Sequence, residues 1–295
     1  MQPFAAFILR GPFQAATVMV AASLLPLLSI VAAGTLALVT LRQGAQQGAM
    51  VAAMAGAVLY ALLFAVTGAG GPALQVVAEQ WLPVLLLAEW LRRSVSLPAT
   101  LLLWMALGGL AVVGFHLAVP DPAAYWQSTV EAFLAAAGGA ELQQMEPEAR
   151  AVLQEELLPV MTGLWAVSLM LTALAGLLIG RGLQALLYNP GGLRQELHDL
   201  DLGRRAGVAA LAVWLGALLS GPGLVYDLSL VVAAGFVVQA LALAHAVAAA
   251  RGWRPGWLVP VYLLAPFLFR PLALVGIGDA LFQWRRRLIG EGPPQ

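Results

Sequence analysis

Several ionisable side chains stand inside otherwise apolar stretches of this sequence, and six of them are the first candidates for chemistry. These residues are Glu79, Glu89, His116, His245, Arg270 and Asp279. A charge in an apolar, low-dielectric surrounding is costly, so each of them is a candidate for binding a proton, an ion or a solute. Arg270 stands out, because it lies in the middle of an apolar run beside Pro271 and has the charge to meet an anionic headgroup or solute.

Structural roles compete with these interpretations. Glu89 precedes Arg93 by four residues, a spacing that favours an ion pair on one helix face. Glu79 lies near the end of its apolar stretch, which favours a place at the membrane interface. If Glu79 is instead buried, we expect a proton or cation site there.

The histidines and the C-terminal charges have similar alternatives. A single histidine in an apolar run, such as His116 or His245, is more often a hydrogen-bonded structural residue than a ligand. Asp279 has Arg286 as a candidate ion-pair partner, and Arg270 has a lipid headgroup. The chain has three histidines, and none forms a His–carboxylate spacing on one helix face, so we expect no metal site.

Sequence signatures of enzymes and cofactor sites are missing. The chain contains no Ser-His-Asp set, HExxH, GxGxxG or EF-hand pattern, and its Gly-Ala-Gly-Gly stretch at 68–71 has no strand–helix context. It has neither lysine nor cysteine, which excludes a P-loop lysine, thiolate chemistry and disulfides. We therefore expect no enzymatic activity and no cofactor. The formal net charge of zero gives no indication of nucleic-acid binding.

Composition predicts an all-α, polytopic transmembrane helical bundle. The chain is 61% hydrophobic, 10% charged and has a mean hydropathy of +0.86, far from the values of soluble domains. A segment of about 20 apolar residues can cross a bilayer as a helix. Eight segments qualify within a single integral membrane domain, 1–295, and they are 13–41, 45–66, 74–91, 98–119, 157–187, 206–220, 224–250 and 257–284.

Arginines predict the topology, because cytoplasmic loops of membrane proteins carry the basic excess. The arginines gather in alternate loops, at Arg42, Arg92-Arg93, Arg181/Arg194/Arg204/Arg205 and Arg251/Arg254. Both termini become cytoplasmic, together with Arg285-Arg286-Arg287, only if the first and last segments are broken or re-entrant. Pro26 and the Arg270-Pro271 step are the expected positions of those breaks.

Two loops have distinct characters. The loop 120–156 holds seven acidic residues and one arginine, and we expect it to lie outside the cytoplasm. Within it, Pro120-Asp121-Pro122 and Glu146-Pro147 predict helix starts, and Gly138-Gly139 predicts a break. An amphipathic helix anchored at the interface by Tyr125 and Trp126 is one interpretation, and a lid over an outward-facing cavity is the other. The loop 188–205 is predicted to be cytoplasmic.

Short motifs carry a resemblance to a known family. The turn Asn189-Pro190-Gly191-Gly192 followed by Arg194-x-Glu196 resembles the cytoplasmic loop of the YybS-like family of uncharacterised bacterial membrane proteins. Residues 36–44 resemble the end of that family's first hydrophobic unit, and 278–285 its C-terminal ending, whereas Leu193 and Leu197 stand where the family has Phe. That family is distantly similar to the substrate-binding subunits of energy-coupling-factor transporters and to the cell-shape protein MreD. The resemblance implies a helical bundle with a solute pocket and membrane partners.

These observations support two functional hypotheses. The first is a subunit of the bacterial inner membrane that binds a small solute among its helices and relies on a separate energising partner. The residues expected to line its solute site are Trp104, Trp165, Trp214, Tyr226, Gln239, His245, Arg270 and Asp279. The second is a structural or scaffolding protein of the cell envelope, MreD-like and without a solute. The residues expected to dock a partner are Asn189, Pro190, Gly191, Gly192, Arg194 and Glu196.

Overall fold

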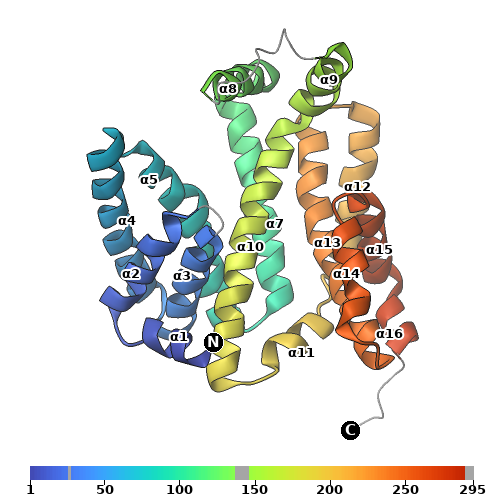
Figure 1. Cartoon of the computed structure of the whole chain (residues 1–295). Helices are drawn as coiled ribbons and strands as arrows, with labels where there is room; N and C mark the ends of the chain where they lie inside the picture. The colour runs from blue at the N-terminus through green and yellow to red at the C-terminus, as the bar shows by residue number, and fades with distance from the viewer. Residues whose placement is uncertain (26–27, 137–145, 290–295) are drawn as a thin grey trace. The chain divides into compact units, whose positions relative to one another are not determined.

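The computed structural model consists of helices joined by short loops (Figure 1). It describes residues 1–25, 28–136 and 146–289, and the predicted break at Gly138-Gly139 lies outside them. The all-α prediction is therefore confirmed for the described part of the chain. The residues group into two compact units, and the helices α7 (Leu97–Ala118), α10 (Met161–Tyr188) and α13 (Leu224–Ala250) contribute to both.

Five stretches of helix are long and apolar enough to cross a membrane. They are Ala45–Thr67, Gly71–Ser94, Leu97–Ala118, Pro147–Tyr188 and Leu224–Ala250. Two bent helix pairs raise the number to seven if each pair counts as one span, against eight predicted segments. The remaining predicted segment, 206–220, forms α12 (Arg204–Ser220), whose 17 residues extend about 25 Å and fall short of a ~30 Å bilayer core.

Unit 1 comprises residues 1–104, 169–202 and 242–253. Its helices are α1 (Gln2–Ile8), α2 (Pro12–Ser23), α3 (Ser29–Gln43), α4 (Ala45–Thr67), α5 (Gly71–Val76), a π-helical turn (Val77–Trp81), α6 (Leu82–Ser94) and α11 (Gly192–His198), with parts of α7, α10 and α13. Helix α3 packs against α2, α4 and α6. It is the centre of the unit, because ten consecutive residues, 32–41, are buried.

Small residues let α10 approach α3 closely. A Cβ added at Gly176 would lie 2.5 Å from the Ala33 Cβ, and one added at Gly180 would lie 2.5 Å from the Ala37 Cβ. The pair Gly176-x-x-x-Gly180 is the small-xxx-small arrangement that allows helix backbones to meet.

Unit 2 comprises residues 105–168, 203–241 and 254–295. Besides its parts of α7, α10 and α13, it contains α8 (Pro122–Ala136), α9 (Pro147–Ala151), a π-helical turn (Val152–Leu157), a 3-10 turn (Leu158–Val160), α12, a second 3-10 turn (Pro255–Leu258), α14 (Val259–Leu264), α15 (Phe269–Phe282) and α16 (Trp284–Ile289). Helix α12 packs along α15. Their contact includes Gly207, where an added Cβ would lie 3.2 Å from the Ala280 Cβ.

The first and last apolar segments are both interrupted, as the topology argument required. The chain bends by 116° between α14 and α15, immediately before the predicted step at Arg270-Pro271. The segment 13–41 is divided into α2 and α3, which pack against each other, around a predicted break at Pro26 that lies outside the described residues. A second bend, of 114° between α1 and α2, falls at Arg10-Gly11 and was not predicted.

The predicted helix starts of the acidic loop are confirmed. Helix α8 begins at Pro122, and the Asp121 carboxylate caps it by accepting a hydrogen bond of 3.0 Å from the Ala124 amide. Helix α9 begins at Pro147, directly after Glu146. A proline at the first position of a helix loses nothing, because that N–H has no partner inside the helix.

Candidate functional site

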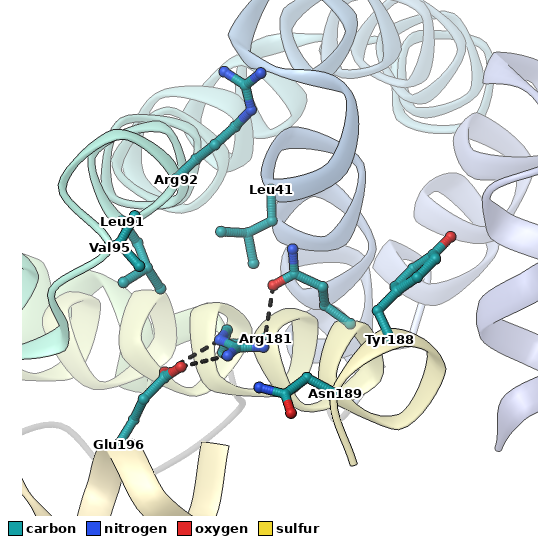
Figure 2. Close-up of a pocket in the computed structure, with 9 residues that line it drawn as sticks. Leu41, Leu91, Arg92, Val95, Arg181, Tyr188, Asn189 and Glu196 are labelled. Atoms are coloured by element: carbon teal, nitrogen blue, oxygen red, sulfur yellow. Dashed lines mark hydrogen bonds and ion pairs between the residues drawn. The ribbon is translucent and has the colours of Figure 1, made fainter. Parts of the chain in front are cut away.

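A cavity of about 270 Å³ lies within unit 1, where the ends of α3, α6 and α10 meet α11. Its apolar lining comes from Leu41, Leu91 and Val95. The polar and charged residues of the lining are Arg92, Arg181, Gln184, Tyr188, Asn189 and Glu196 (Figure 2). A small concave site with convergent polar groups in an otherwise apolar chain is the usual form of a solute site.

An ion pair forms the centre of the polar lining. The Arg181 guanidinium donates from both Nε and Nη2 to the two carboxylate oxygens of Glu196, and from Nη1 to the Gln184 amide oxygen at 3.2 Å. Figure 2 shows Arg181 joined to Glu196, with the Asn189 side chain beside it. The two charged side chains are 12% and 32% exposed, so water and solutes reach the Glu196 end of the pair.

The Asn-Pro-Gly-Gly turn explains how Glu196 reaches Arg181. Gly191 has φ 90° and ψ −12°, the left-handed geometry that the third residue of a type II turn requires, and the Gly192 amide donates to the Asn189 carbonyl at 3.0 Å. The turn reverses the chain after α10 and starts α11. Gly192 is buried, and a Cβ there would lie 2.9 Å from Asn189 Cγ, so glycine leaves room for the Asn189 side chain.

The rim of the cavity is basic. Arg92 points away from Arg181 (Figure 2) and makes one long ion pair, 3.5 Å, with Glu89. The predicted pair of Glu89 with Arg93 is confirmed at 2.6 Å, and the other Glu89 oxygen accepts from the Ala45 amide at 2.9 Å. The hydrogen bond between the Ala45 amide and Glu89 joins the start of α4 to the second half of α6.

Two further residues complete the rim. The Arg42 guanidinium lies 3.6 Å from the centre of the Tyr188 ring, a cation–π contact. Val95 ends α6 with φ 50°, a left-handed conformation that a β-branched residue adopts only with strain. Arg42, Arg92, Arg93 and Arg181 therefore gather at one end of unit 1, which agrees with the prediction that their loops share one side.

The residues predicted to line a solute site do not come together in one place. In unit 1, Trp104 is buried in the core, and its indole donates a hydrogen bond of 2.6 Å to the Met170 carbonyl. His245 is half-buried on α13 and does not line the cavity. The burial of Trp104 and its hydrogen bond to Met170 assign it a packing role.

In unit 2, Gln239 and Asp279 do meet. Gln239 Nε2 donates to Asp279 Oδ2 at 3.0 Å, and the Arg285 amide donates to Asp279 Oδ1 at 2.9 Å. The Arg285 guanidinium completes the network with an ion pair of 3.6 Å. The predicted partner, Arg286, was wrong, because the left-handed Gln283 ends α15 and turns the Arg285 backbone toward the carboxylate.

The other predicted solute residues of unit 2 lie in separate contacts. Arg270 is exposed, and its guanidinium lies 5.1 Å from the centre of the Tyr226 ring. Trp165 belongs to an aromatic cluster with Phe115 and Trp126, and Trp214 is half-buried on α12. That Trp126 anchors α8 at the membrane interface stays a prediction. In the structure its indole donates a hydrogen bond of 2.9 Å to the buried Thr162 hydroxyl.

Two of the residues predicted to dock a partner, Asn189 and Glu196, line the cavity. Pro190, Gly191 and Arg194 are exposed, and their role in docking stays a prediction. Sequence analysis missed the lining residues Arg92 and Arg181. Each follows an apolar run and reads as an ordinary loop arginine, and nothing in their spacing signals that the three helix ends meet.

Comparison with models of protein families, with curated proteins and with solved structures gives no match for this chain. The resemblance to the YybS-like family therefore stays a prediction.

Proposed function

We propose that this chain is a small-solute-binding subunit of a membrane transporter, and that the solute occupies the unit 1 cavity. The observation that carries the proposal is the open Arg181–Glu196 ion pair, which adjoins about 270 Å³ of space together with Gln184 and Asn189. These groups offer donors, acceptors and both signs of charge. A small polar solute with at least one charged group fits them.

The rest of the chain agrees with this role. Five to seven apolar stretches can cross a membrane, which supports a multi-pass protein, and we place it in the bacterial inner membrane with the basic rim on the cytoplasmic side. The family that this chain resembles is distantly similar to substrate-binding subunits of energy-coupling-factor transporters, which favours the same function and a separate energising partner. We propose that this partner docks at the exposed residues Pro190, Gly191 and Arg194, next to the cavity.

The test is purification in a gentle detergent from native membranes, with mass spectrometry of co-purified small molecules and proteins. Leu91→Trp fills the cavity, because Leu91 is 5% exposed and lines it. Leu110→Trp is the matched control, because Leu110 is 67% exposed on α7. Circular dichroism and thermal unfolding establish that both variants are folded.

A polar small molecule that co-purifies with the wild type and with Leu110→Trp, and is lost from Leu91→Trp, is the expected result. An ATPase-bearing module among the proteins supports the transporter assignment. Recovery of cell-envelope proteins with no small molecule, in all three preparations, contradicts the proposal and favours the scaffolding function.

A further inference from the structure

Unit 2 contains a buried ion pair between helices that are far apart in the sequence. His116 Nε2, near the end of α7, lies 2.8 Å from Asp227 Oδ2, in the first turn of α13. Both helices are apolar, with mean hydropathies of 2.0 and 2.2 in their most apolar windows. Ionisable residues in such segments are rare, because burying a charge is costly, and they usually pair with one another.

The two members of the pair differ in access to solvent. Asp227 is 1% exposed, whereas the His116 side chain is 18% exposed. Asp227 Oδ1 is buried and faces the backbone of Gly163, where an added Cβ would lie 2.7 Å from it. The carboxylate is thus enclosed on the α10 side, and the imidazole is its contact with water.

Other charged and titratable groups stay outside the pair. Within the described residues, His116 is the ion-pair partner of Asp227. On the α8 side, the Tyr125 ring packs edge-on against Phe115, the residue before His116, with 5.2 Å between the ring centres. On the α15 side, Arg270 lies over the neighbouring Tyr226.

We propose that His116 and Asp227 form a proton-binding site that opens toward the ends of α7 and α13. An ionised carboxylate can only accept hydrogen bonds. His116 Nε2 therefore carries a hydrogen and donates a hydrogen bond to Asp227 Oδ2. The exchangeable proton then enters and leaves at Nδ1, the other ring nitrogen. When Nδ1 carries this proton, the pair is an imidazolium and a carboxylate. When Nδ1 has lost it, the imidazole is neutral and the buried carboxylate keeps its charge.

The chemistry of histidine makes this site exchangeable. Histidine is the side chain whose charge ordinarily changes close to physiological pH, whereas arginine remains charged. Asp279 in the same unit is held by Arg285, so its counter-charge is permanent. The site does not depend on the unit 1 cavity, and a failure of the solute proposal leaves it intact.

The test is solid-state NMR of the full chain with ¹⁵N-labelled histidine in lipid bilayers, since the shifts report which ring nitrogens carry protons. Three histidines give few signals, and His198→Gln and His245→Gln assign them. We expect His116 Nδ1 to change its protonation between about pH 5 and pH 9, while Nε2 remains protonated. A His116 signal that stays unchanged over this interval overturns the proposal.

Variants test the role of the carboxylate. In Asp227→Asn the amide no longer selects an Nε2–H donor, so we expect neutral His116 to populate the Nδ1–H tautomer as well. Asp279→Asn, a matched loss of a buried carboxylate, is expected to leave the His116 spectrum unchanged. An unchanged tautomer in Asp227→Asn contradicts the proposal, and if that variant fails to fold, the wild-type spectrum still decides.

Discussion

The Arg181–Glu196 pair in unit 1 and the Asp279 network in unit 2 hold buried charge in opposite ways. Asp279 is 2% exposed, accepts hydrogen bonds from Gln239 and from the Arg285 amide, and forms an ion pair of 3.6 Å with the Arg285 guanidinium. Glu196 is 32% exposed and faces a cavity. The Asp279 network therefore links helices α13, α15 and α16, whereas the Arg181–Glu196 pair leaves polar atoms exposed to the cavity.

Asp227 lies between these two cases. It is as buried as Asp279, but among the described residues its ion-pair partner is a histidine, and its second oxygen faces the Gly163 backbone. Burial alone therefore does not separate a structural carboxylate from a functional one. The nature and number of the partners do.

Asp279→Asn is expected to have the largest effect on stability. It leaves the Arg285 guanidinium, 15% exposed, without its counter-charge, and breaking a buried pair costs about 3 kcal/mol or more. The measurement is the free energy of unfolding in detergent micelles. Adding Arg285→Gln is expected to recover part of the loss, because it removes the orphaned charge; strictly additive losses would show that the two residues do not act as a pair.

Arg181→Gln is expected to cost less, about 1–2 kcal/mol, because the Glu196 that remains is one-third exposed and water hydrates it. The variant is also expected to lose the co-purified solute. Thermal unfolding and mass spectrometry of the same preparation measure both effects. A loss of stability equal to that of Asp279→Asn would mean that the pair is closed, and the comparison between the two units would fail.

Asp227→Asn is expected to change the free energy of unfolding by no more than about 1 kcal/mol. The substitution removes a buried charge and keeps a hydrogen-bonding group next to His116, so the two effects offset each other. Unfolding measured beside Asp279→Asn, under identical conditions, tests this. Equal losses in the two variants would place Asp227 among the structural carboxylates.

Val95→Gly is expected to have the smallest effect and to stabilise the protein by about 0.5–1 kcal/mol. Val95 ends α6 at φ 50°, and glycine adopts this left-handed conformation without the clash of a branched Cβ. Gln283→Gly, at φ 54° after α15, is the matched variant in unit 2. We expect a smaller gain there because glutamine is unbranched at Cβ. The midpoints of thermal unfolding compare the two variants. A loss of stability in Val95→Gly would contradict the claim that Val95 is strained in its left-handed conformation.

The fold class and several local features could be predicted from the sequence, because they depend on neighbouring residues. The length of the apolar runs predicts helices, Pro120-Asp121-Pro122 predicts the start of α8, and the Glu89–Arg93 spacing predicts an ion pair. The bend next to Arg270-Pro271 followed from proline chemistry and the arginine count.

The sites could not be predicted, because they join residues that only the fold brings together. His116 and Asp227 are 111 positions apart, and Gln239 and Asp279 are 40 apart, so no helical spacing links them. Likewise, Trp104 and Trp165 are typical of solute sites by residue type, but both are used for packing. Apolar patterns determine which helices form, but in a membrane they do not determine which faces meet.

The most direct test of the solute-binding account is an experimental structure of the protein purified from native membranes into lipid nanodiscs. We predict density for a small polar molecule in the unit 1 cavity, within hydrogen-bonding distance of Arg181 or Glu196 and of Asn189. A cavity that holds only water, with the Arg181–Glu196 pair intact, would contradict the account.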